Sequence, residues 1–183
     1  MDYTDRIARH YQDVWDSPCK ARRWPEGPMK SLRKEFCVLE FPETPSRNMW
    51  TYATCNMSAP DDGFRLELHL YAPEQSASHV ELLTVIAHYH ITGHRLGLHH
   101  TVNFGRPWVE GSACDHGFIS LPYLDGPRLE RLDAEGMRVN FLWLIPITPA
   151  EVEFKKSAGV DALEARFDEA GFNYIDPMRR SVV

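Results

Sequence analysis

The longest apolar stretch of the chain lies in residues 137–147, with the sequence MRVNFLWLIPI. Near its middle, apolar side chains occupy both sets of alternating positions, which is typical of a strand buried on both faces inside a sheet. The next four residues, 148–151 (TPAE), form a capping box with proline at the first helical position. The strand is therefore predicted to lead directly into a helix, on which Glu151 and Lys155 make a favourable pair.

Three more strands are predicted earlier in the chain, at residues 35–41, 49–57 and 64–71. The third has the clearest alternation, with apolar Phe64, Leu66, Leu68 and Leu70 between Arg65, Glu67, His69 and Tyr71. This pattern predicts one apolar face and one mostly polar face. Because an Asp-Asp-Gly turn precedes it, the second and third strands are expected to pair as a hairpin. Shorter strands are expected at 101–104 and 118–121.

Helices are predicted at both ends and in the middle of the chain. The first has Tyr3, Ile7 and Tyr11 at helical spacing and stops at the following Ser-Pro pair. A capping box at residues 78–81 begins a central helix that runs to about Gly93. A last helix begins near residue 161 and ends at a glycine, residue 171. The sequence thus predicts a mixed α and β fold.

Size and charge limit the kinds of partner. The chain has 183 residues, a net charge of -6 and 20 dispersed lysines and arginines. This length predicts one domain over residues 1–183. Without a basic stripe or a long apolar span, neither nucleic acid nor a membrane is expected as a partner. The start of the chain lacks a signal-peptide pattern and the cysteines are far apart, so a reduced, cytoplasmic protein is expected.

The histidine-rich region 88–116 is the best place to look for catalysis. Nucleotide-binding loops, serine-hydrolase elbows and zinc-protease motifs are all missing from the sequence. His90 and His94 could share a metal ion, but a zinc site needs three or four converging ligands. Cys114 and His116 could form a nucleophile pair, but nothing fixes an oriented base or oxyanion donors. No catalytic residue, metal or cofactor is therefore predicted, and a metal-assisted hydrolase or Cys-dependent enzyme is the alternative.

Residues 103–110 form a loop in which an arginine and a tryptophan lie close together. Both residue types are frequent anchors of protein interfaces, so Arg106 and Trp108 are candidates for partner binding. Trp108 follows a proline and could equally be a core residue that plugs the end of a turn. Similarly, Asp61 and Asp62 could serve only the turn in which they lie.

Several stretches together resemble the Suppressor of fused domain family. These are residues 80–108, which end in LHHTVNFGRPW, residues 141–148 with the following Glu151, residues 176–182 (DPMRRSV), residues 49–58 and residues 63–70. They occur in the same order and with similar spacing over residues 35–183. The chain is similar to the single-domain bacterial type.

The resemblance implies an α+β domain with a mixed, mostly antiparallel sheet packed with helices, no known catalytic residues, and binding of protein partners. Animal members restrain transcription factors of Hedgehog signalling by gripping an extended peptide between two domains, a clamp that a single domain cannot form. Bacterial members are linked, in some gene contexts, to immunity against secreted toxins. A toxin or a regulatory protein is therefore the expected partner. The predicted partner-binding residues are Asp61, Asp62, Asn103, Arg106, Trp108, Asp115 and His116.

Overall fold

The computed structural model describes residues 2–134 and 137–183. Over these residues, eight strands form one mixed sheet in the order β1-β2-β3-β4-β8-β6-β5, with β7 also paired to β8. The strands are β1 (Lys20–Arg22), β2 (Cys37–Phe41), β3 (Trp50–Cys55), β4 (Arg65–Ala72), β5 (Thr101–Asn103), β6 (His116–Ser120), β7 (Arg131–Ala134) and β8 (Met137–Ile147). Every pairing is antiparallel except that of β4 with β8. The predicted hairpin of β3 and β4 is confirmed.

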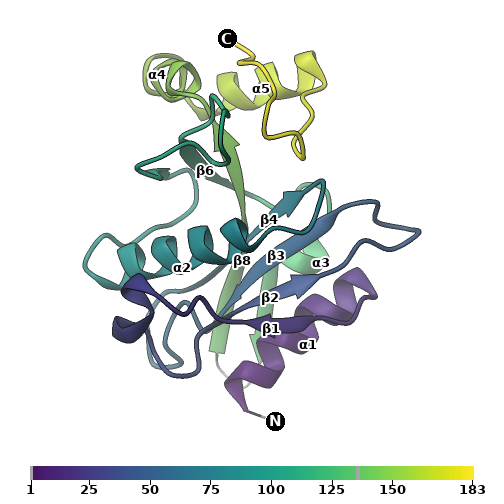
Figure 1. Cartoon of the computed structure of the whole chain (residues 1–183), viewed down its shortest axis with the longest axis vertical. Helices are drawn as coiled ribbons and strands as arrows, with labels where there is room; N and C mark the ends of the chain where they lie inside the picture. The colour runs from purple at the N-terminus through teal and green to yellow at the C-terminus, as the bar shows by residue number, and fades with distance from the viewer. Residues whose placement is uncertain (1, 135–136) are drawn as a thin grey trace.

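Helices cover both faces of this sheet and one of its ends (Figure 1). They are α1 (Tyr3–Trp15), α2 (Ala77–Ile91), α3 (Pro127–Glu130), α4 (Pro149–Ala158), α5 (Val160–Ala170) and the short 3-10 helix η1 (Gly27–Ser31). The long helix α2 lies across the sheet, while α4, α5 and the C-terminus lie at the end of the molecule opposite α1. This α+β architecture confirms the predicted fold class. None of the helices in the described parts of the chain is long and apolar enough to cross a membrane.

The interior position predicted for β8 is confirmed. Its residues pair with β4 on one side and with β7 and β6 on the other. Alternate side chains serve opposite faces, since Leu142 and Leu144 join the core under α2 while Val139 and Phe141 pack under α1. Pro146 lies where β8 pairs with β6 and beyond the residues that pair with β4, so its missing amide hydrogen is tolerated.

The alternation predicted for β4 is confirmed, and its mostly polar face is buried as completely as its apolar face. Glu67, His69 and Tyr71 are at most 1% exposed. The carboxylate of Glu67 accepts a hydrogen bond from the Thr54 hydroxyl at 2.6 Å, and the His69 ring packs against Trp15 of α1. Burial raises the pKa of Glu67 to about 8 and lowers that of His69 to about 4. Helix α1, at the start of the chain, thus covers the face of β4 that the alternation in β4 makes polar.

The predicted helix starts are partly correct. The Thr148 box is confirmed, with the Thr148 amide donating to the Glu151 carboxylate at 2.8 Å. The box predicted at residues 78–81 is wrong, because α2 begins at Ala77 and its cap is Ser76, two residues before the predicted cap.

The predicted pair of Glu151 with Lys155 is also wrong. Glu151 is engaged by Arg179 at 2.7 Å, while Lys155 donates to the Thr101 hydroxyl at 3.0 Å and to the His99 carbonyl.

Candidate partner-binding site

The loop between β5 and β6 is fixed by its own hydrogen bonds. The Asn103 side chain accepts from the Gly105 amide at 2.6 Å, and the Trp108 amide donates to the Cys114 carbonyl at 2.7 Å. Gly105 has a positive φ of 74°, which a residue with a side chain rarely adopts. The loop therefore presents its exposed residues on a defined backbone.

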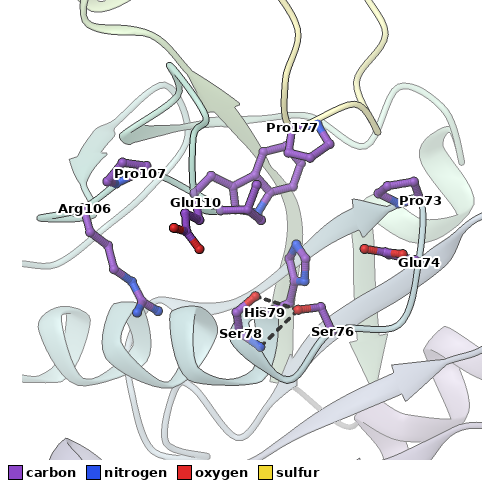
Figure 2. Close-up of a pocket in the computed structure, with 11 residues that line it drawn as sticks. Pro73, Glu74, Ser76, Ser78, His79, Arg106, Pro107, Glu110 and Pro177 are labelled. Atoms are coloured by element: carbon purple, nitrogen blue, oxygen red, sulfur yellow. Dashed lines mark hydrogen bonds between the residues drawn. The ribbon is translucent and has the colours of Figure 1, made fainter.

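Glycine at position 117 allows this loop to pack against the sheet. A Cβ atom there would lie 2.5 Å from the Leu144 side chain and 2.8 Å from the Phe104 ring. Phe104 is therefore able to close over β6, and the loop that follows it is held next to the start of α2 (Figure 2).

Of the two interpretations of Trp108, the structure favours the core residue. Trp108 is 3% exposed and belongs to the core cluster under α2. Its ring makes an edge contact with the His79 ring, with the centroids 5.6 Å apart, and His79 stacks on Tyr52 at 5.1 Å. The tryptophan thus holds the loop down, and the loop residues around it reach solvent.

A cavity of about 400 Å³ lies between this loop and the start of α2 (Figure 2). Its walls come from the start of α2 and the segment before it, from the loop and from the C-terminal segment: Pro73, Glu74, Ser76, Ser78, His79, residues 106–110 and Pro177. Figure 2 shows the His79 ring standing up from the helix into this space, with Glu74 and Glu110 to either side. The cavity therefore joins segments that are about 100 residues apart in sequence.

The positive charge of Arg106 at the rim is neutralised within the protein. The Arg106 guanidinium donates to the Glu81 carboxylate at 2.6 Å, and its side chain remains 46% exposed. Burial lowers the pKa of His79 to about 4, so its ring is uncharged near neutral pH. The Arg106–Glu81 pair ties the loop to the first turns of α2.

Asp115 and His116 lie at the other end of the same loop. The Asp115 carboxylate is 2.6 Å from Nδ1 of His116, and His116 is opposite Asn103 in the β5–β6 pairing. Cys114 is fully buried, and that burial raises the pKa of its thiol. Position 114 is therefore a buried thiol and not an activated thiolate.

The histidines considered for a metal site point in different directions. His90 is buried and its Nδ1 accepts from the Leu96 amide at 2.9 Å, whereas His94 lies beyond the end of α2 and stacks on Tyr89. Within residues 2–134 and 137–183, no group of three His, Cys, Asp or Glu side chains is placed to hold a metal ion.

Asp61 and Asp62 lie apart from the other predicted residues. The Asp62 carboxylate accepts from the Ala59 amide at 2.7 Å and lies 3.8 Å from Arg95, which follows α2. Arg106, in contrast, contacts Glu81 near the beginning of α2. The structure therefore brings Asn103, Asp115 and His116 together, places Arg106 and Trp108 beside the cavity, and leaves the two aspartates near the far end of α2.

Sequence reasoning missed His79, Ser76 and Pro177, which line the cavity with the loop. The only local signal was a pair of serines before a histidine at a helix start, and that signal is common. Nothing in the sequence links Pro177 to residue 79.

Comparisons with known proteins agree on one family. The sequence matches the Suppressor of fused protein (SUFU) family over residues 33–180. A SUFU homologue from Neisseria gonorrhoeae FA 1090 is 33% identical, with a TM-score of 0.87 over 100% of this chain and 98% of that one. No curated protein gives a significant match.

Two more distant structures share the fold. A chain of a Sufu–Fu complex is 14% identical, with a TM-score of 0.71 over 98% of this chain and 92% of that one. Drosophila Suppressor of Fused is also 14% identical, with a TM-score of 0.66 over 96% of this chain and 50% of that one. On the family match and the bacterial homologue, this chain belongs to the Suppressor of fused family.

Proposed function

We propose that this protein is a non-catalytic module that binds a protein partner through the β5–β6 loop, the free edge of β5 and the adjoining cavity. The observation that carries the proposal is a fixed, solvent-facing loop beside a preformed cavity. Membership of a family in which one structure is a Sufu–Fu complex supports a protein as the ligand.

The edge of β5 offers main-chain hydrogen bonds to such a partner. The Phe104 amide donates to the Asp115 carbonyl, and the Ile119 amide donates to the His100 carbonyl. By the alternation of an antiparallel ladder, the main-chain groups of Thr101 and Asn103 point away from β6. Because β5 ends the sheet, an extended segment of a partner could pair there.

Side chains next to this edge supply selectivity. Asn103, Arg106 and the Asp115–His116 pair occupy the two ends of one loop and are at least partly accessible. Arg106 is held in place by Glu81, which lowers the entropy that its side chain would lose on binding. Trp108 supports them from below, and a partner reaches it only through the cavity that it lines.

We further propose that the biological role is sequestration in the cytoplasm, with immunity against a toxin as the specific form. A module of this kind acts by covering a surface that the partner needs, so that no chemical step is required. A regulatory protein held inactive in the same way is the other form of this role.

Affinity capture from the source organism tests the binding site. The tagged protein is compared with Arg106→Ala and Asn103→Ala, and with Arg22→Ala, which removes an arginine–glutamate pair at the opposite edge of the sheet. We expect one protein that the wild type and Arg22→Ala retain and that the loop variants bind about 2 kcal/mol more weakly, with melts unchanged. Equal capture by all variants would contradict the site.

The partner identified in this way then tests the role. If it is a toxin, co-expression with this protein should protect cells, and Arg106→Ala should protect them less. If expression of the partner alone does not harm cells, the proposal of immunity against a toxin is wrong. Sequestration of a regulatory protein is then the proposed role.

A further inference from the structure

The cavity beside α2 contains buried polar atoms that lack a partner. Among the described residues, Nε1 of Trp108 has no hydrogen-bond partner, and neither ring nitrogen of His79 has one in normal hydrogen-bond geometry, although the Ser76 main chain lies close to the His79 ring and each residue is only 3% exposed. Both side chains line the cavity, and the His79 ring stands in it (Figure 2). Because unpaired buried polar groups are costly, such a cluster indicates a place where a ligand or water completes the hydrogen bonds.

The unpaired atoms specify which hydrogen bonds a ligand has to make. The indole nitrogen of Trp108 can only donate, so it needs an acceptor. An uncharged His79 ring has one donor and one acceptor nitrogen. The two rings are neighbours, with centroids 5.6 Å apart. One group that carries an acceptor and a donor at the same end could therefore serve both.

Charge around the cavity favours an uncharged ligand. Glu74 and Glu110 flank the space, while the guanidinium of Arg106 is committed to Glu81 at 2.6 Å. The two carboxylates disfavour an anion. The carboxylates would attract a cation, but a cation offers no acceptor to the indole N–H of Trp108 and would leave that buried donor unpaired.

The walls of the cavity are mostly apolar. Pro73, Pro107 and Pro177 stand around it, together with Val109. They offer contact to one or two methylene groups between the polar end of a ligand and its main chain. A volume of about 400 Å³ is sufficient for one side chain of this size.

We propose that the cavity binds the primary carboxamide of an Asn or Gln side chain of the partner, with its carbonyl accepting from Trp108 Nε1 and its amide group donating to His79. A primary carboxamide carries both groups at one end, whereas the carbonyl and N–H of a trans peptide point in opposite directions. This inference rests on the proposed function, because a side-chain pocket requires a protein partner.

Small molecules test the pocket without the partner. Nitrogen-15 spectra of the intact protein resolve indole N–H signals of the tryptophans, and Trp108→Phe assigns the one from Trp108. The probe is propionamide, and the comparison compounds are propionate, N-methylpropionamide, 1-propanol and methylguanidinium. We expect a saturable shift of the Trp108 signal with propionamide and about tenfold weaker binding of each comparison compound, since each leaves a buried atom unpaired or places a charge there.

A variant provides a second measurement. His79→Phe keeps a ring of similar size and removes both nitrogens, so we expect propionamide to bind about tenfold more weakly. His88→Phe, on the same helix but outside the cavity, is the matched control and should bind as the wild type does.

Two outcomes would overturn the inference. They are an unchanged Trp108 signal at saturating propionamide, and equal shifts with propionamide and 1-propanol, which would mean that the cavity serves water or any small solute. If these occur while Arg106-dependent capture persists, the carboxamide pocket is wrong and the proposed function stands. If propionamide binds and no partner is captured, the proposed function fails, and so does the assignment of the carboxamide to a partner.

Discussion

Replacing Arg179 with methionine is expected to destabilise the fold by about 3–5 kcal/mol, the usual cost of removing one partner of a buried ion pair. Its guanidinium donates to both oxygens of Glu151, at 2.7 and 2.8 Å, and to the Pro146 carbonyl at 2.8 Å. Glu151 also accepts from the amides of Thr148 and Val182. The carboxylate would therefore remain buried with amide donors but without a counterion.

The size of this effect makes it easy to measure. Proteins are typically stable by about 5–15 kcal/mol, so a large share would be lost. For a chain of this length we expect the Tm to fall by about 10 °C. Urea denaturation followed by circular dichroism gives the free energy of unfolding directly. Arg180→Met is the matched control because Arg180 is adjacent in sequence and exposed.

The pH dependence separates the ion pair from simple loss of packing. Burial alone would raise the pKa of Glu151, but hydrogen bonds from Arg179 and the Thr148 amide outweigh it and hold the pKa below its ordinary value of 4.5. Stabilisation by this carboxylate is therefore full above that value and is lost as pH falls through the folded-state pKa. In Arg179→Met, the same burial without the guanidinium favours the neutral acid.

The gap in stability between the wild type and Arg179→Met should thus be widest near neutral pH and narrow in acid. Two results would refute the reasoning. One is an Arg179→Met protein within about 1 kcal/mol of Arg180→Met, which is well below the cost of an unpaired buried charge. The other is a gap that stays constant as the pH is lowered through the titration of Glu151.

Three other predictions have defined outcomes. Thr148→Ala should cost about 1 kcal/mol through loss of the helix cap, measured by urea denaturation against the exposed control Ser157→Ala, and an unchanged midpoint would show that the cap is dispensable. Glu67→Gln should flatten the pH dependence of stability. Burial raises the pKa of Glu67 from 4.5 to about 8, so the neutral Glu67 side chain stabilises the wild-type fold in full below pH 4.5 and this stabilisation is lost as pH rises through 8. Glutamine does not titrate, so the variant lacks this dependence. If both proteins give parallel curves, Glu67 does not titrate in this range. Elemental analysis should find no stoichiometric zinc or iron after mild purification, because His90 already accepts from the Leu96 amide; about one metal per chain that is lost in His90→Ala would show the opposite.

Local sequence patterns were sufficient to predict those elements whose stabilising contacts join residues a few positions apart. The Thr148 cap and Glu151 are three residues apart, and their reciprocal hydrogen bonds form within one helical turn. The first helix was equally readable, because Ile7, Tyr11 and Trp15 are its buried residues at helical spacing. At the start of α2 the same signature gave a wrong cap, since Ser76 and Ser78 compete for one helix end and only the backbone geometry selects Ser76.

Part of the candidate site could be predicted and part could not. The loop with Arg106 was identifiable from its residue types, and the structure places it as an exposed segment between β5 and β6, while its role in partner binding stays a prediction. Whether Trp108 faces solvent or the core could not be read from a proline beside it, because the answer depends on His79 and Tyr52. The cavity itself needs Pro177, which is about 70 residues from the loop.

The sequence by itself determined the family, the interior strand β8, the hairpin of β3 and β4 and the helix that begins after Thr148, because strand alternation and helix capping act between residues a few positions apart. Only the tertiary structure decided that the polar face of β4 is buried under α1, that Glu151 pairs with Arg179, and that His79 and Trp108 meet in one cavity. Burial and the choice of ionic partner depend on which distant segments pack together, and periodicity along the chain carries no information about that.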